Sequence, residues 1–370
     1  MVGRRATSVA VGIVGLSWML AACGAAEPPR APLIAGPPDG PIGEWTELPW
    51  SGADPTLEFN GGHVHAVGDS TYLLVADRFY RSDDHGTHWS QRGTEMLGDF
   101  APQGPRLFGW DGNQEAPLYT STDGGATWGG RPVATYSGDQ IQSTGAFASP
   151  RFLAVLGSTA FMTQWSQANR LYISEDATRG WTGVSVPGEV QDLGARGDEI
   201  YACTSEGMFR STDRGRVWSA IPSPDGVATP LTGCTFTRFA TLLCPTVSRY
   251  SGARLYCTAD GTSFRLADDG LFDVPANPDW ARFEGMEYLE ASAQLGSTYV
   301  LADRGSNSYA PREEGVYTTN DPFQGWTRVE ALRGERVLGI TQTTQAILVL
   351  SQPKTFENDR KLRLFRLRVR

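Results

Sequence analysis

One stretch, Leu118 to Trp128, has the pattern of a strand end, a polar turn and the start of a second strand. Ser121 and Asp123 can hydrogen-bond to the turn's own amides, and Gly125 can take a positive φ at little cost. Trp128 offers a large apolar surface to bury just beyond the turn. The stretch therefore predicts a β-hairpin, and by itself it predicts no chemistry.

The same pattern recurs along the chain. Two copies keep all four positions, as Ser82, Asp84, Gly86 and Trp89 and as Ser211, Asp213, Gly215 and Trp218. Three copies keep fewer, as Ser174, Asp176 and Trp181, as Asp260 with Phe264, and as Thr319, Asp321 and Trp326. The copies start 39, 53, 37, 47 and 61 residues apart. Short strands with a period of about 40–50 residues are typical of propeller blades.

The motif Ser-x-Asp-x-Gly-x-Thr-Trp resembles the Asp-box, or BNR repeat. This resemblance implies an all-β propeller of four-stranded antiparallel blades, with each Asp-box between the third and fourth strands. Three more strands are expected after the last copy, and Glu44–Pro49 precedes the first blade without a blade of its own. We therefore predict seven blades, with the N-terminal strand completing the last. Six or eight blades stay open, because the spacings of 53 and 61 can hide insertions.

The N-terminal residues have the features of an export signal. Residues 1–22 combine a basic start with an apolar run, and Leu20-Ala21-Ala22-Cys23 resembles the bacterial lipobox. We expect Cys23 to be lipidated, residues 23–43 to form a Pro/Gly/Ala-rich tether, and residues 44–370 to form the propeller. A plain signal peptide followed by a chance cysteine is the alternative. The expected location is the bacterial membrane, on its periplasmic side or at the cell surface.

Charge and cysteine content limit the classes of partner and the cellular compartment that are expected for this chain. The net charge of −9 argues against nucleic acid as a partner. Beyond Cys23 the chain has four cysteines, and an even number in an exported protein suggests disulfides. Cys234 and Cys244 lie on consecutive expected strands and form the favoured pair, with Cys203 and Cys257 left for the second. The three possible pairings stay open.

Binding residues are expected on the face opposite the Asp-boxes, where the longest irregular segments fall. Aromatic side chains there can stack on sugar rings or anchor a protein partner. The candidates are Trp110, Trp165, Tyr250, Trp280, Arg304, Tyr309 and Arg312. Any one of these aromatics can equally pack under its own loop.

An enzymatic function is the alternative, because sialidases are among the Asp-box propellers. A glycosidase needs two carboxyl groups at a defined separation. The candidates are Asp99, Glu284 and Glu287, although Glu284 and Glu287 are better explained as charged residues lining a wet central channel. His63 and His65 point to one side of a strand, but no nearby cysteine or third histidine supports a metal site, and we expect no cofactor.

The favoured interpretation is a lipid-anchored, monomeric, non-catalytic cell-envelope propeller that binds a protein or a glycan. The alternative is a sialidase-like glycoside hydrolase that uses a pair of carboxylates.

Overall fold

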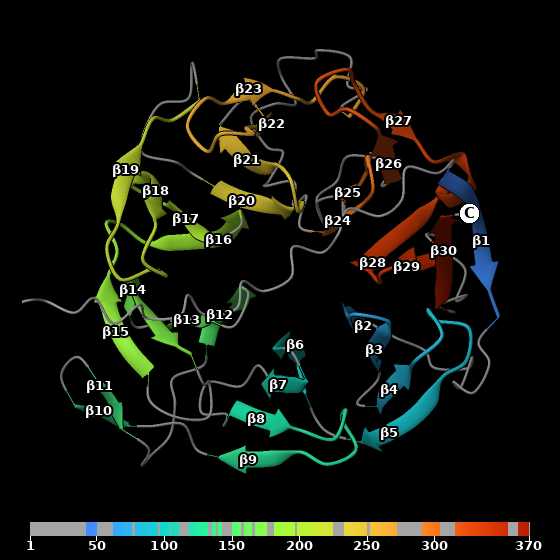
Figure 1. Ribbon diagram of the computed structural model, residues 1–370, viewed down its shortest axis with the longest axis horizontal. Helices are drawn as coiled ribbons and strands as arrows, with labels where there is room; N and C mark the ends of the chain where they lie inside the picture. Colours follow the sequence, from blue (N-terminus) through green and yellow to red (C-terminus); the bar gives the residue numbers. More distant parts are fainter. Residues whose placement is uncertain are drawn as a thin grey trace, which may run out of the picture. The chain divides into compact units, whose positions relative to one another are not determined.

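Residues Gly36–Arg370 form one compact unit, which contains every strand described below. The structure is a computed structural model, and it describes residues 42–49, 62–75, 78–94, 97–103, 105–110, 118–131, 135–137, 140–142, 150–156, 159–164, 167–175, 181–196, 198–224, 233–249, 252–271, 291–303, 315–353 and 362–369. Within this unit, seven antiparallel sheets surround a common centre (Figure 1).

The first three sheets, called blades 1 to 3 in chain order, take up residues 62–185. Blade 1 contains β2 (Gly62–Val67), β3 (Ser70–Val75), β4 (Arg78–Ser82) and β5 (Ser90–Thr94). Blade 2 contains β6 (Asp99–Gln103), β7 (Arg106–Trp110), β8 (Leu118–Ser121) and β9 (Gly129–Arg131). Blade 3 contains β12 (Pro150–Leu156), β13 (Thr159–Gln164), β14 (Gln167–Ser174) and β15 (Trp181–Ser185), extended by the hairpin β10 (Thr135–Ser137) and β11 (Gln140–Gln142).

The next three sheets repeat this four-stranded plan. Blade 4 contains β16 (Val190–Arg196), β17 (Glu199–Thr204), β18 (Gly207–Ser211) and β19 (Ser219–Ile221). Blade 5 contains β20 (Gly233–Arg238), β21 (Leu243–Arg249), β22 (Gly252–Cys257) and β23 (Arg265–Leu266). Blade 6 contains β24 (Ala291–Leu295), β25 (Thr298–Asp303), β26 (Gly315–Thr319) and β27 (Thr327–Arg328), followed by the short 3-10 helix η1 (Glu330–Leu332).

Blade 7 closes the ring with strands from both ends of the described chain. It contains β28 (Glu335–Gln342), β29 (Ala346–Pro353), β30 (Arg363–Val369) and, outermost, β1 (Ile42–Leu48). β1 is antiparallel to β30, with Trp45 opposite Leu367. Buried Glu335 accepts hydrogen bonds from Ser351 Oγ (2.8 Å) and from the Arg363 guanidinium (2.8 Å). The prediction of seven blades closed by an N-terminal strand is therefore confirmed.

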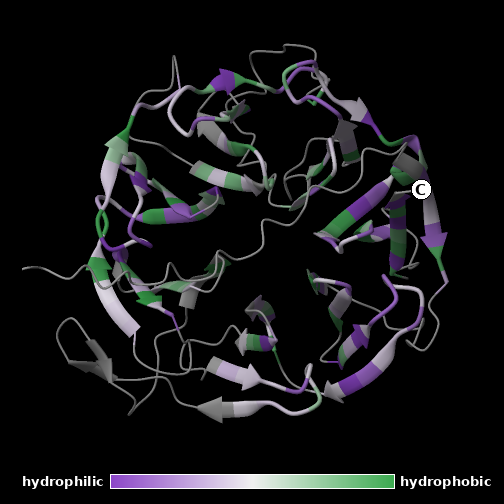
Figure 2. Ribbon diagram, viewed as in Figure 1, coloured by the Kyte–Doolittle hydropathy of each residue, from purple (hydrophilic) through white to green (hydrophobic). Residues whose placement is uncertain are grey.

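The core lies between neighbouring blades. The innermost strands of successive blades contact one another around the whole ring, from β2 through β6, β12, β16, β20 and β24 to β28 and back to β2. Leu73 and Tyr80 of blade 1, for example, pack with Leu348 and Leu364 of blade 7 in one buried cluster. Inner strands such as β16 and β28 carry both hydrophobic and hydrophilic residues (Figure 2), whereas the outer strand β5 is largely exposed. Each blade is thus stabilised by the next.

The disulfides differ from the favoured prediction. Cys203 on β17 pairs with Cys234 on β20, which joins blades 4 and 5, and Cys244 pairs with Cys257 inside blade 5. The predicted Cys234–Cys244 pair is wrong because Cys244 lies opposite Thr237, three residues from Cys234 along β20. An odd offset puts two side chains on opposite faces of a sheet.

Candidate functional site

The recurring turns between third and fourth strands are hydrogen-bonded networks, which we call the serine–aspartate turns. In blade 2, Ser121 Oγ donates to Asp123 Oδ1 (2.8 Å) and accepts from the Gly125 amide (2.8 Å). The same Asp123 oxygen accepts from the amides of Ala126 (3.0 Å) and Thr127 (2.9 Å). Hydrogen bonds to the carboxylate, of which that from the Thr127 hydroxyl has the largest effect, lower the pKa of Asp123 to about 2.

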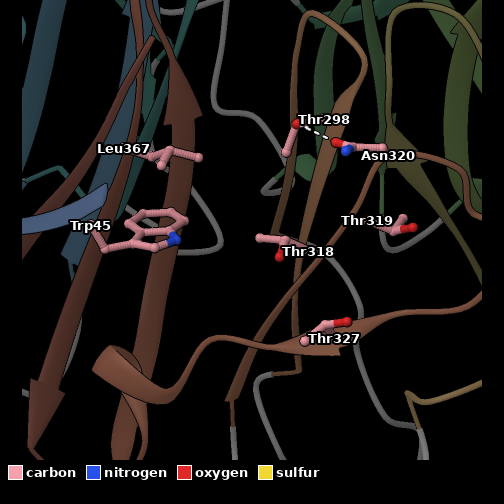
Figure 3. A pocket seen from close by; sticks show the side chains of 7 residues that line it. All are labelled: Trp45, Thr298, Thr318, Thr319, Asn320, Thr327 and Leu367. Carbon is pink, nitrogen blue, oxygen red and sulfur yellow. Dashed lines mark hydrogen bonds between the residues drawn. The ribbon is translucent and has the colours of Figure 1, made fainter. Parts of the chain in front are cut away.

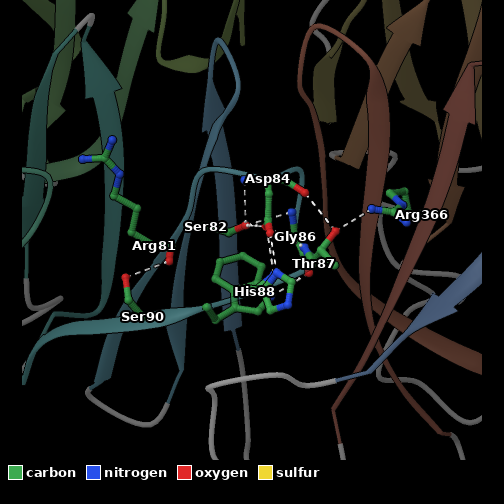
Figure 4. Close-up of polar contacts among 9 residues, drawn as sticks. Arg81, Ser82, Asp84, Gly86, Thr87, His88, Ser90 and Arg366 are labelled. Carbon is green, nitrogen blue, oxygen red and sulfur yellow. Dashed lines mark hydrogen bonds and ion pairs between the residues drawn. The ribbon is translucent and has the colours of Figure 1, made fainter.

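The turns of blades 1, 4 and 5 use equivalent donors and acceptors, with Thr258 in place of the serine in blade 5. In blade 1 (Figure 4), Ser82 Oγ accepts from the Gly86 amide (2.9 Å), and Asp84 accepts from the amides of Thr87 and His88. The indole of Trp89 then donates to the Gly86 carbonyl (3.0 Å). Burial raises the pKa of Asp84, but the bonds from His88 and Ser82 outweigh it and lower the value to about 2. Asp213 and Asp260 accept equivalent amide bonds.

The turn of blade 6 departs from this pattern, and most of the turn of blade 3 lies outside the described residues. In blade 3, Ser174 and Trp181 are buried at the ends of β14 and β15, and Asp176 lies outside the described residues. In blade 6, Asp321 Oδ1 accepts from the Phe323 amide (3.0 Å), and the buried indole of Trp326 donates to the Ala267 carbonyl of blade 5 (2.8 Å).

The glycines of these turns pack against the preceding blade. Gly125, at φ +84°, lies against the ring of Phe79, and Gly261, at φ +78°, lies against Tyr201. A Cβ at Gly215 would lie 3.0 Å from Phe161, and one at Gly86 would lie 3.1 Å from Leu364. The turns therefore fix the spacing of blades, and their carboxylates are already occupied by backbone amides.

The opposite side of the ring holds the connections between second and third strands and the links between blades; we call it the long-loop face. β25 ends at Asp303 and β26 begins at Gly315, while β23 ends at Leu266 and β24 begins at Ala291. On the other side, β24 ends at Leu295 and β25 begins at Thr298. Segments long enough to form a binding surface therefore start and end on the long-loop face.

Most sequence-predicted site residues fall in these segments. Trp110 ends β7 on the long-loop face. The other candidate binding residues lie outside the described residues: Trp165, Tyr250, Trp280, Arg304, Tyr309 and Arg312. Cys23, Glu284 and Glu287 also lie outside them. Their roles remain predictions.

One polar cluster at the long-loop end of the inner strands is described. Asp99 begins β6, and its Oδ1 lies 2.9 Å from Nδ1 of His63 and 3.8 Å from Nε2 of His65, both on β2 of the neighbouring blade. Asp99 Oδ1 also accepts from the Phe100 amide (2.7 Å), and the His65 ring packs edge-on against Phe100. All three polar side chains are about one-third exposed, at 35% for each histidine and 30% for Asp99.

This cluster was not predicted as a unit. The histidines and Asp99 were each considered, but only the contact between β2 and β6 brings them together. The sequence contained only one indication of this contact: Asp99 begins the inner strand of blade 2, and the two histidines lie on the inner strand of blade 1.

The cluster favours an ionised carboxylate. Burial raises the pKa of Asp99, but hydrogen bonding to His63 and His65 and the attraction of their imidazoles lower it far below its usual range. A glycosidase general acid requires the opposite shift. Asp99 is therefore unsuited to donate a proton at neutral pH. Its contacts with His63 and His65 instead join blade 2 to blade 1.

Asp99→Asn is expected to lower the free energy of unfolding by about 2 kcal/mol at pH 7, because hydrogen bonds to a charged partner are lost. Since the folded-state pKa is depressed, this stabilisation is complete above the unfolded-state pKa of about 4 and is lost as the pH falls towards the folded value. Urea unfolding of both proteins at pH 7 and pH 3 measures it. An equal difference at both pH values would contradict the assignment.

Metal-ligand clusters and membrane-spanning helices are both absent from the described residues. Among them, no three His, Cys, Asp or Glu side chains are grouped so as to hold a metal ion. Nor does that part of the chain contain a helix with the length and apolarity needed to cross a membrane.

Comparison with solved structures identifies proteins of the same fold. No protein-family model matches the sequence, and no curated protein sequence matches it. Among solved structures, YCF48 from Cyanidioschyzon merolae is similar with a TM-score of 0.55 and 15% identity, over 88% of this chain and 98% of that one. YCF48 bound to D1 peptide has a TM-score of 0.52 and 16% identity, over 90% and 96% of the two chains.

A third similar structure is the extracellular domain of the one-component system BT4673 from B. thetaiotaomicron. Its TM-score is 0.54 at 11% identity, and the match covers 87% of this chain and 39% of that chain. Identities this low show the fold alone. The comparisons and the seven closed blades therefore lead to one conclusion: this chain is a β-propeller with the architecture shared by these proteins.

Proposed function

We propose that this chain is a lipid-anchored protein of the bacterial cell envelope that binds a protein partner on its long-loop face without catalysing a reaction. The observation that carries the proposal is the asymmetry of the ring. On one side, the serine–aspartate turns of blades 1, 2, 4 and 5 pack against the preceding blade, whereas the longest connections start and end on the other side. A rigid ring that presents long segments on one face is a scaffold suited to binding.

Two further points support a protein partner over a substrate. Asp99, the one catalytic candidate among the described residues, has a depressed pKa and contacts two histidines, so it lacks the character of a glycosidase acid. YCF48, whose structure was solved with a D1 peptide, shares this fold. The turn motif supports placing the chain among Asp-box propellers, and the Leu20–Cys23 motif supports lipidation at Cys23.

The aromatic residues Trp165, Trp280 and Tyr309 are proposed as anchors, because buried aromatic side chains dominate protein interfaces. Replacing all three by alanine is expected to weaken partner binding by about 100-fold or more and to change Tm little. The partner is identified first by placing a photo-crosslinking amino acid at position 309 in cells.

The matched control places the same photo-crosslinking amino acid at Val217, a residue 66% exposed in the serine–aspartate turn of blade 4. Adducts that form from position 309 and are absent from position 217 support the proposal. Equal adducts from both positions, or full binding by the triple alanine variant, would refute the site.

A further inference from the structure

A pocket of about 390 Å³ lies between blades 6 and 7. Blade 6 contributes Thr298, Thr318, Thr319, Asn320 and Thr327 to its lining. Blade 7 contributes Trp45 of β1 and Leu367 of β30, which are paired neighbours (Figure 3). Because the serine–aspartate turn of blade 6 joins Thr319 to Thr327, the pocket lies on the side of those turns, away from the long-loop face.

The way the ring closes explains why the interface between blades 6 and 7 leaves a pocket. At four other interfaces between blades, the turn glycine of one blade packs against the preceding blade. These glycines are Gly86, Gly125, Gly215 and Gly261. Blade 7 has no such turn, because its third strand β30 and its outer strand β1 come from opposite ends of the chain. Thr318 in blade 6 is equivalent to Ile173 in blade 3, because each lies one residue before the turn and pairs with the residue after the tryptophan. Ile173 packs against Gly215, the turn glycine of the next blade. In blade 6 that position borders the pocket instead.

The chemistry of the lining selects a class of ligand. None of the seven lining side chains carries a charge, so a charged ligand would lose its hydration without compensation. A wholly apolar ligand would leave the hydroxyls of Thr318 and Thr327 unpaired. Asn320 Oδ1 already accepts from Thr298 (2.7 Å), which leaves its amide group as a donor. The half-buried indole of Trp45 adds an aromatic surface and a ring N–H.

We propose that this pocket binds a neutral pyranose residue of a glycan. A sugar ring combines an apolar face, which suits Trp45, with hydroxyls that pair with threonine and asparagine side chains. The volume lies within the range of about 300–1,000 Å³ found for small-ligand sites. This site is separate from the proposed partner-binding face, so either proposal can fail without the other.

Saturation-transfer NMR with the purified full chain tests the proposal, using maltose, cellobiose, lactose and N,N′-diacetylchitobiose as probes. At least one disaccharide is expected to bind, with about tenfold weaker affinity in Trp45→Ala and about threefold weaker affinity in Thr318→Val. Trp45→Phe keeps an aromatic ring and is expected to retain most of the binding.

The matched control is Thr120→Val, because Thr120 precedes Ser121 in blade 2 as Thr318 precedes Thr319 in blade 6. Binding that falls in the Trp45 and Thr318 variants and persists in the Thr120 variant supports the site. Trp45 also packs on the core cluster of blades 6 and 7, so Tm is measured for each variant and Thr318→Val decides if Trp45→Ala unfolds. The absence of binding by all four disaccharides, or equal loss in Thr120→Val, overturns the proposal.

Discussion

Gly125→Ala is expected to lower the free energy of unfolding by about 3 kcal/mol or more. Two costs add at this position. The backbone φ of +84° is disfavoured for a residue with a Cβ, at about 1–2 kcal/mol. The new methyl group would also overlap the ring of Phe79, and overpacking of a core costs about 1–3 kcal/mol.

Phe79 has little room to move away. It is fully buried, and its ring packs edge-on against Phe100 and Trp128 and stacks on Tyr72. These rings belong to the buried cluster between blades 1 and 2. A shift of Phe79 would therefore disturb the whole seam.

Gly334→Ala is the matched control for this prediction. Gly334 has a similar φ of +80°, but a Cβ there would meet nothing within 4 Å. It is expected to show the backbone cost alone, about 1–2 kcal/mol. Urea unfolding of both variants separates the two costs. Equal destabilisation would mean that the turn glycine does not fix the spacing of the blades.

Removal of the Cys203–Cys234 disulfide, by changing both residues to alanine, is expected to lower the free energy of unfolding by about 3–4 kcal/mol. The bridge joins residues separated by 31 positions, and closing a loop of that size restricts the unfolded chain. Cys244 and Cys257 are separated by 13 positions, so their removal is expected to cost slightly less, about 3 kcal/mol. Denaturant unfolding under oxidising conditions measures both.

A crossed variant tests the pairing itself. Cys203→Ala with Cys257→Ala leaves Cys234 and Cys244, which lie on opposite faces of blade 5. Titration of thiols in the denatured protein is expected to find both of them free. A disulfide between these two residues would contradict the arrangement of blade 5 described above.

Local signals in the sequence were enough to predict the fold. In blades 1, 2, 4, 5 and 6, a serine or threonine hydroxyl and an aspartate carboxylate accept hydrogen bonds from amides of their own turn. The turns could therefore be identified without knowledge of distant residues. The spacing of 53 between the second and third turns includes the β10–β11 hairpin, which extends blade 3. This insertion was allowed for but was not placed, because nothing in its residues fixes which strand it joins.

Contacts between blades could not be read in the same way. The wrong Cys234–Cys244 pair followed from strands that are consecutive, whereas pairing depends on which face each side chain occupies. The contact of Asp99 with His63 and His65 depends on the packing of β2 against β6. Trp45 was recognised only as part of a closing strand, and its pocket exists because closure leaves blade 7 without a turn.

The pairing of β1 with β30 also determines the order in which the molecule can fold. Ile42 lies opposite Val369, so the last blade can be completed only when nearly the entire chain is present. Contacts between residues this distant in sequence are slow to form, because a very long loop must close first. Until then, β30 presents an unpaired strand edge that can pair with other chains. Each molecule is therefore most prone to aggregation before β1 pairs with β30.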